Sequence, residues 1–251
     1  AADAANAALA KLVFAGAPGL AAPAWCAART RGVAAAPLTP DQAKAGPVVV
    51  GAGNLPLPAK AWDALRANPR VDAATLDLAA RLVAEMGLGK RAAPDMLSVS
   101  LSATDYIGHA YGTEGLEMCI QMAELDRSLG AFFARLDAMG IDYAVVLSAD
   151  HGGLDMPERL DQQGLAVAHR VDPRLMPAAL SKAIGASLGL TDKGTLVYGE
   201  GPFGDYYVSR NLPDATRAWV LAELTARLKG HPDVAAVFTR EEMAVAPPSG
   251  N

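Results

Sequence analysis

The hydrophobic positions between residues 95 and 155 change periodicity twice. Residues 96–101 (MLSVSL) and 143–147 (YAVVL) are short, mostly apolar runs, which predicts two β-strands, the second of them buried on both faces. Between them, apolar residues from Met118 to Met139 recur at gaps of 4, 3, 4, 3, 4 and 3, the spacing of one helix face, and Gly140 stands where a helix-ending glycine belongs. Strand, helix and strand form a βαβ unit, so the two strands are expected to be parallel, with a right-handed crossover.

The rest of the chain predicts shorter elements around this unit. A helix is expected to begin with Asp72 as its N-cap and to end at Gly87. We therefore predict an α/β fold, a mostly parallel sheet sandwiched by helices, in which residues 1–164 are part of the core and residues 165–245 form a smaller α+β subdomain. The remaining predicted elements are strands at 47–51, 195–198, 206–209 and 234–238, the middle two forming a hairpin, and helices at 177–188 and 213–229.

Composition and charge exclude several classes of protein. The chain has 251 residues, and an apolar content of 51% is too high for a disordered chain. Its net charge of −5, without any basic run, argues against nucleic acid as a partner. The longest charge-free run, 12–28, contains Pro18 and Pro23, so we expect no membrane span. An anionic substrate would need a local positive feature, and a bound metal ion would supply one.

Two cysteines, Cys26 and Cys119, lie 93 positions apart. They form no CxxC pair, which excludes a thiolate zinc site and a disulfide-dense scaffold. A single bridge between them stays open. We favour two buried thiols, because Cys119 opens an apolar helical pattern.

Two carboxylate–imidazole pairs follow the two predicted strands of the βαβ unit. Asp105 and His109 come after the first strand, four residues apart, so one helical turn would place both on one face. Asp150 and His151 come directly after the second strand, and the glycines that follow allow the backbone to bend so that both side chains converge. Ligands of open α/β sheets bind at the carboxyl ends of the strands. We therefore expect the four side chains to meet at one edge of the sheet.

Aspartate oxygen with neutral histidine nitrogen is the donor set of Zn²⁺, and it also suits Mn²⁺, Fe and Co²⁺. Two such pairs would suit two ions about 3.5–4 Å apart. Either pair alone is better explained as a helix cap or a loop contact, but two pairs at matched strand ends favour a metal site. His169 and His231 lack this context and are interpreted as surface or loop residues. Asp155 and Glu158 could hold imidazole protons, although we favour solvated loop charges.

The segments SLSATDYIGHAYG, EMCIQMAELDRSLGAFFARLD and VVLSADHGG closely resemble the alkaline phosphatase superfamily. The resemblance is closest to its branch of type I phosphodiesterases and nucleotide pyrophosphatases, which includes the monomeric alkaline phosphatases of PafA type. It implies two-zinc hydrolysis of small-molecule phosphate esters through a phospho-threonine or phospho-serine intermediate, in a monomeric, periplasmic or secreted protein. It also implies that Asp105 and His109 bind one zinc ion, and that Asp150 and His151 bind the second.

The chain departs from the family pattern in three ways. No strand ends in the expected aspartate, the third histidine of the first zinc site is not found, and the nucleophile is not identified, because Thr30, Thr39 and Thr75 stand in no matching context. We therefore expect a catalytic domain that is incomplete on its own. Residues 1–25 also lack the basic start of a signal peptide.

The sequence leaves other functions open. The favoured one is a phosphomonoesterase, and a phosphodiesterase or nucleotide pyrophosphatase is the first alternative. A sulfatase, phosphonate hydrolase or phosphomutase would keep the metals and change the chemistry, although neither cysteine stands in a sulfatase motif. A module of another class would keep the fold and bind metal without catalysis.

Overall fold

A computed structural model describes residues 2–35, 48–165, 167–201 and 204–245. The chain divides into two compact units, Ala1–Ala168 and His169–Asn251. The assignment of domains to residues 1–164 and 165–245 stays a prediction. Within the described ranges no helix combines the length and apolar character that crossing a bilayer requires.

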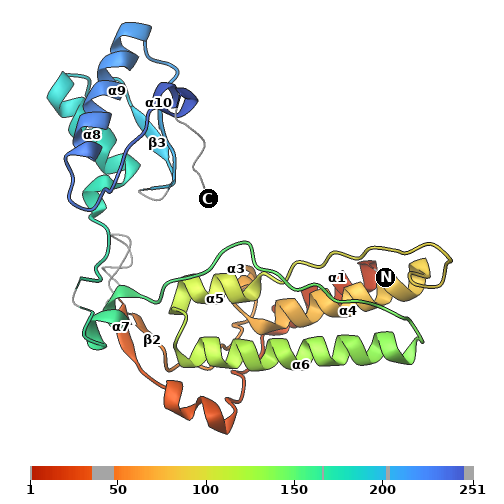
Figure 1. Ribbon diagram of the computed structural model, residues 1–251. Coiled ribbons are helices and arrows are strands. Elements are labelled where there is room, and N and C mark those ends of the chain that lie inside the picture. The colour runs from red at the N-terminus through yellow and green to blue at the C-terminus, as the bar shows by residue number, and fades with distance from the viewer. Residues whose placement is uncertain (1, 36–47, 166, 202–203, 246–251) are drawn as a thin grey trace. The chain divides into compact units, whose positions relative to one another are not determined.

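The first unit is mostly helical, and its helices are joined by long extended segments (Figure 1). Its two short strands, β1 and β2, pair antiparallel, with Val33 opposite Val50. Pro47, the first residue of the predicted strand, lies outside the described residues. The elements are α1 (Ala2–Ala15), a 3₁₀ helix η1 (Ala24–Arg29), β1 (Val33–Ala35), β2 (Val48–Val50), α3 (Trp62–Arg66), α4 (Pro69–Met86), α5 (Ala103–Tyr111), α6 (Leu116–Ala138) and α7 (Pro157–Gln162).

Helices α4 and α6 pack side by side and share an apolar core that contains Leu76, Val83, Phe132 and Leu136. The second half of the apolar stripe predicted for 118–139, from Leu129 to Met139, forms this face of α6, whereas Met118 packs in a separate cluster and Met122 is exposed. Gly140 takes the positive φ of 62° that allows the helix to end there. The N-cap of α4 is Asn68, whose side chain accepts a hydrogen bond from the backbone N–H of Arg70.

The prediction that Asp72 caps α4 is wrong, because this carboxylate is buried one turn into the helix. It accepts hydrogen bonds from the N–H of Ala103 at 3.1 Å and from Nε2 of Gln121 at 2.9 Å. Burial raises its pKa. Asp72 therefore links α4 to the first residue of α5 and does not cap its own helix.

The two predicted strands of the βαβ unit are extended segments without ladder partners among the described residues. They follow α4 and α6 and run back along those helices from the same end (Figure 1). Val99, Leu101 and Ile141 cover the core of the two helices. The expected burial on both faces of 143–147 is wrong, because Val146 is 94% exposed. A strand gains a second buried face only from paired neighbours, and the described residues supply none.

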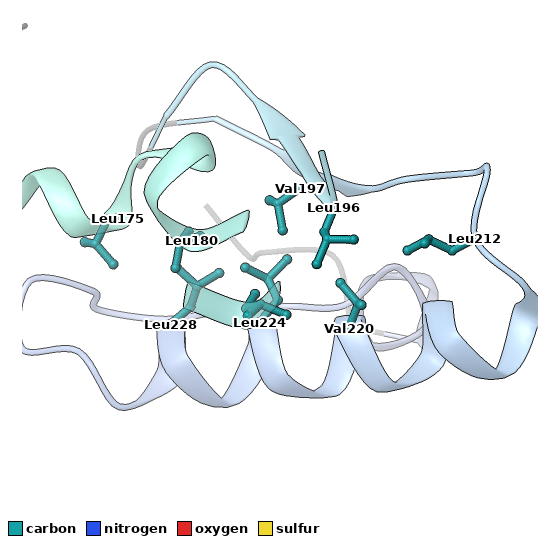
Figure 2. Packing of buried hydrophobic residues seen from close by; sticks show 9 residues of the cluster. Leu175, Leu180, Leu196, Val197, Leu212, Val220, Leu224 and Leu228 are labelled. Atoms are coloured by element: carbon teal, nitrogen blue, oxygen red, sulfur yellow. The ribbon is translucent and has the colours of Figure 1, made fainter. Parts of the chain in front are cut away.

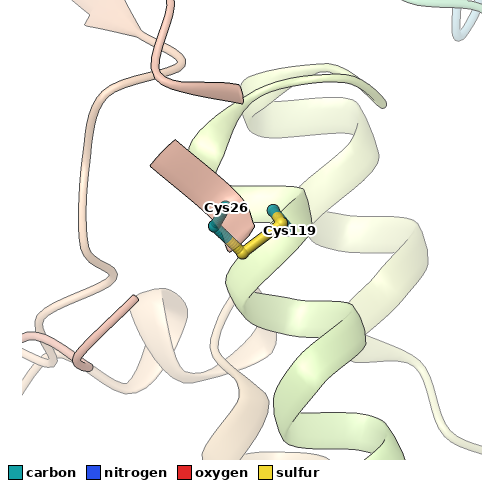
Figure 3. The surroundings of a disulfide bond; sticks show 2 residues. All are labelled: Cys26 and Cys119. Carbon is teal, nitrogen blue, oxygen red and sulfur yellow. A yellow bond between two sulfur atoms is a disulfide. The ribbon is translucent and has the colours of Figure 1, made fainter. Parts of the chain in front are cut away.

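Cys26 of η1 and Cys119 of α6 form a disulfide (Figure 3). The preference for two free thiols is therefore wrong, although both side chains are buried as expected. The helical pattern around Cys119 gave no information about η1, which brings the Cα atom of Cys26 to 5.8 Å from that of Cys119. The bridge joins the N-terminal region to the first turn of α6.

The second unit agrees more closely with the sequence pattern. Helices α8 and α9 pack through Leu180, Ile184, Val220 and Leu224, and Leu196 covers them from the hairpin (Figure 2). The predicted hairpin is confirmed, with Tyr198 opposite Tyr207, while residues 202–203 of its turn lie outside the described residues. The elements are η2 (Pro173–Leu175), α8 (Pro177–Leu188), β3 (Val197–Gly199), β4 (Tyr206–Val208), α9 (Asp214–Lys229) and α10 (Arg240–Val245).

The strand predicted at 234–238 is wrong. This segment is irregular and leads into α10, a helix that the pattern did not predict. Val234 and Val237 are three residues apart and both pack against the core of the unit, whereas Phe238 is exposed. Val234 and Val237 are therefore partly buried because they pack on the core, and their spacing of three does not follow the two-residue period of a strand.

Two aspartate–histidine pairs in the second unit predict a loss of stability in acid. Nε2 of His169 lies 2.9 Å from Oδ1 of Asp233, and Nε2 of His231 lies 3.3 Å from Oδ2 of Asp172. Hydrogen bonds from Arg174 hold the pKa of Asp172 far below its usual range, and the bond with His169 lowers the pKa of Asp233. A folded-state pKa below the unfolded value stabilises the fold above the unfolded pKa, and this stability is lost as pH falls through the folded pKa.

We therefore expect the urea midpoint of the second unit to fall once the pH drops below about 5, where the carboxylates of the unfolded chain begin to bind protons, and to continue falling as the pH decreases further. Amide resonances of α8 and α9 would report it in the full chain. The drop should be smaller in the Asp233→Asn variant, whose side chain does not titrate. Equal drops in both proteins would show that this carboxylate does not stabilise the fold through its charge.

Candidate metal centre

Helix α5 presents the first carboxylate–imidazole pair. The Asp72 carboxylate binds the N–H of Ala103, which fixes where α5 begins, and Gly112 follows its last residue with a φ of 82°. Asp105 lies in the first turn and His109 in the last turn of this helix. Their side chains share one face as predicted, with His109 Nε2 3.3 Å from Asp105 Oδ1.

The loop after the second extended segment brings His151 to the same carboxylate. His151 Nε2 lies 3.2 Å from Asp105 Oδ1, and the ring centroids of His109 and His151 are 6.4 Å apart. One ligand atom from each of Asp105, His109 and His151 lies within 4.8 Å of the other two. Residues 42 positions apart thus converge on one carboxylate oxygen.

A backbone contact selects the nitrogen that His151 presents to this cluster. Its Nδ1 lies 2.8 Å from the carbonyl oxygen of Gly152, so Nδ1 carries the hydrogen and donates it. The lone pair of the neutral ring then resides on Nε2, the atom that faces Asp105. The same hydrogen bond is the main reason that the pKa of His151 is raised, and the negative charges of Asp150 and Asp105 add to it.

Asp150 lies beside this cluster, not within it. Its Oδ2 is 3.8 Å from Nε2 of His151, and its Oδ1 accepts a hydrogen bond from the backbone N–H of His151. The side chain of Asp150 is 89% exposed. The carboxylate can therefore rotate without breaking packing contacts. Among the described residues, His169 and His231 bind aspartates of the second unit and take no place in the cluster.

The donor set fits a divalent transition metal. Three side chains offer one carboxylate oxygen and two imidazole nitrogens at mutual distances that a single ion can span, and Asp150 supplies a fourth donor close by. Zinc in catalytic sites takes such nitrogen and oxygen ligands and keeps a position open for substrate. Calcium does not fit, because it prefers oxygen ligands alone.

The residues that anchor this region were missed or misjudged from the sequence. Asp155 was interpreted as a solvated loop charge, but it is buried and pairs with Arg159, and it contacts no imidazole that the structure describes. Buried Glu117 accepts hydrogen bonds from the N–H groups of Gly51 and Gly53 at 3.0 and 2.8 Å. The spacing of four between Asp155 and Arg159 is the one sequence signal that could have indicated a pair.

Two of the threonines of the first unit use their hydroxyl groups in structural hydrogen bonds. Thr104, next to Asp105, accepts a hydrogen bond from Nε2 of Gln121 at 3.0 Å. Thr75 donates to the carbonyl of Val71 at 2.8 Å, and Thr39 lies outside the described residues. A nucleophile is therefore not assigned.

Comparison with known families explains the arrangement. Residues 22–245 match the family described as type I phosphodiesterase / nucleotide pyrophosphatase, and the chain belongs to this family. Two curated relatives place it nearer to one branch. The chain is 44% identical to alkaline phosphatase PhoK of Sphingomonas sp over 234 residues, which are 93% of this chain and 40% of the relative. It is 46% identical to alkaline phosphatase PhoD of Zymomonas mobilis over 197 residues, 78% of this chain and 34% of that relative.

The matched residues thus span 40% of the length of the first relative and 34% of the length of the second. Among solved structures, the crystal structure of wild-type alkaline phosphatase PafA matches with a TM-score of 0.59 at 23% identity, covering 74% of this chain and 36% of that one. This likeness shows an alkaline phosphatase-like α/β fold, as the sequence predicts. The parallel strand pairing expected within the βαβ unit is not among the pairings of the described residues.

Proposed function

We propose that this protein hydrolyses phosphate esters with zinc bound by Asp105, His109, Asp150 and His151, and that phosphomonoesters are its preferred substrates. The observation that carries the proposal is the convergence of both imidazoles on Asp105 Oδ1, at 3.3 and 3.2 Å. Family membership supports the reaction class. The names of the two curated relatives, both alkaline phosphatases, favour monoesters over the diesters in the family description.

The residues of the cluster have separate tasks in this proposal. Asp105 contacts both histidines, so it sets their spacing and supplies the central negative charge. His109 and His151 offer neutral nitrogen donors, the latter through Nε2 because its Nδ1–H is bound to Gly152. Exposed Asp150, beside His151, would contribute to the second zinc position that the resemblance implies. When bound, zinc supplies positive charge that neutralises a phosphoryl group and favours a deprotonated nucleophile.

The proposal includes the covalent intermediate that the resemblance implies. A threonine or serine oxygen forms a bond to phosphorus while the ester oxygen departs with the alcohol, and water then cleaves the phospho-residue to release phosphate. The hydroxyl proton leaves on attack, and the alcohol gains a proton. The disulfide Cys26–Cys119 supports a second part of the proposal, that the protein works in an oxidising compartment such as the periplasm.

Hydrolysis of p-nitrophenyl phosphate and bis-p-nitrophenyl phosphate by the full-length gene product tests the proposal. We expect faster turnover of the monoester, and a loss of at least about 100-fold in kcat/KM for His109→Ala. Asp126→Ala, which removes an exposed carboxylate of α6, is the matched control and should retain activity. Diester turnover alone would favour the phosphodiesterase alternative, and no turnover of either ester would favour a non-catalytic metal-binding module.

A further inference from the structure

We infer that the buried pair of Asp155 and Arg159 positions the two halves of the metal centre relative to each other. This inference rests on the proposed metal site and assigns a role to two residues that contact none of its ligands. Asp155 lies four residues after His151, and Arg159 of α7 donates a hydrogen bond to the carbonyl oxygen of Tyr111, the last residue of α5. The pair therefore lies between the loop that carries His151 and the helix that carries His109.

The contacts of this pair converge on three consecutive residues after His109. Oδ1 of Asp155 accepts hydrogen bonds from Nη1 of Arg159 and, at 2.8 Å, from the N–H of Thr113. Nη2 of Arg159 donates to the carbonyl oxygen of Tyr111 at 3.2 Å. The end of α5 is thus held from both sides of Gly112 by side chains that belong to the segment after His151.

Gly112 makes this close approach feasible. Its φ of 82° lies in the region that favours glycine, and a Cβ atom there would overlap Oδ1 of Asp155 and Nη1 of Arg159. Both charged side chains are buried, with 1% exposure for Arg159 and 7% for Asp155. Neither charged group can exchange its partner for water unless the loop between His151 and Asp155 opens. The contact therefore holds this loop in one position against the end of α5.

The metal ligands themselves need such a support. The side chains of Asp105, His109 and His151 are 39%, 73% and 55% exposed, so packing around them does not fix their positions. Leu154, between the ligand loop and Asp155, is 90% exposed and anchors nothing. The first buried contact after His151 is therefore Asp155. We conclude that Asp155 and Arg159 hold the distance between His109 and His151 that zinc requires.

The test compares metal-free and zinc-loaded protein in the full chain. Three variants weaken the contact of the Asp155–Arg159 pair with the end of α5 in different ways: Arg159→Met, Asp155→Asn and Gly112→Ala. In each we expect zinc to bind about 10- to 100-fold more weakly by calorimetry, the range typical of residues that orient metal ligands. In the metal-free chain we expect faster amide exchange at Thr113 and across 150–156.

Two controls separate positioning from simple destabilisation. Asp161→Asn changes an exposed carboxylate of α7 and should alter neither measurement. Leu136→Ala weakens the α4–α6 core and should lower the thermal stability without changing the zinc affinity. If a variant does not fold, the milder Asp155→Asn variant keeps an oxygen for the Thr113 N–H and carries the test.

The outcomes distinguish this inference from the proposed function. Weaker zinc binding together with faster exchange supports the positioning role. Faster exchange with unchanged zinc affinity overturns it and leaves the metal site intact. A wild-type chain that binds no zinc overturns the proposed site and this inference with it.

Discussion

Replacing Asp105 with alanine is expected to weaken zinc binding by more than about 100-fold, because the loss of a ligand exceeds the 10- to 100-fold cost of losing a residue that only orients one. Among the residues that the structure describes, Asp105 is the carboxylate that contacts both imidazoles, through Oδ1 at 3.3 and 3.2 Å. Its removal leaves His109 and His151 without a common anion between them. Titration calorimetry of chelator-treated protein with zinc chloride measures the effect.

The matched control for this experiment is Asp126→Ala on α6, which removes an aspartate carboxylate outside the cluster. Its zinc affinity should equal that of the wild type. Asp150→Ala is expected to give a smaller loss than Asp105→Ala, because its carboxylate lies 3.8 Å from one imidazole. If Asp150→Ala lowered the zinc affinity more than Asp105→Ala does, the ion would lie beside Asp150 rather than beside Asp105.

Removing the disulfide is expected to lower the free energy of unfolding of the first unit by about 4–5 kcal/mol, because the bridge closes a loop across 93 positions. In the chain-entropy account a crosslink over that length removes much of the freedom of the unfolded chain. The expected loss is a large fraction of the stability of an ordinary domain. Urea unfolding of the Cys26→Ala/Cys119→Ala variant, followed by the amide resonances of α4 and α6, measures it.

Wild-type protein under reducing conditions provides the comparison, because it keeps both side chains and loses the bond alone. Its midpoint should fall nearly as far as that of the double variant, which also loses two buried sulfur atoms. The second unit contains no cysteine among its residues, so its unfolding should not respond to reduction. An unchanged midpoint for α4 and α6 on reduction would show that the bridge does not stabilise this unit.

The sequence predicted α4, α6, α8 and α9, because their signals are local, but it did not predict α1, α3, α5, α7 or α10. The apolar stripe of 118–139, the glycine that follows it, and the proline that begins α8 all act within a few turns of the chain. The candidate site was also predictable. Two Asp–His pairs after apolar segments predicted that four side chains meet at the edge of a sheet. The structure brings three of them, Asp105, His109 and His151, together with Asp150 beside them, although no sheet joins these segments among the described residues.

The features that were missed depend on contacts between distant segments. Cys26 meets Cys119 only because η1 packs on α6, and Asp72 becomes an acceptor for α5 only because α4 lies beside it. The charged residue Arg159 is 1% exposed, which composition alone would not suggest. The segments 96–101 and 143–147 were predicted as strands from side chains alone, while strand formation also requires a hydrogen-bonded neighbour.

The most direct test of the metal centre is anomalous diffraction at the zinc absorption edge from crystals of the zinc-loaded protein. We expect an anomalous peak in bonding contact with the carboxylate of Asp105 and with Nε2 of His109 or His151. Any second peak should lie beside Asp150. A loaded protein whose anomalous density appears only elsewhere, for example at His169 and His231, would contradict the proposed metal centre.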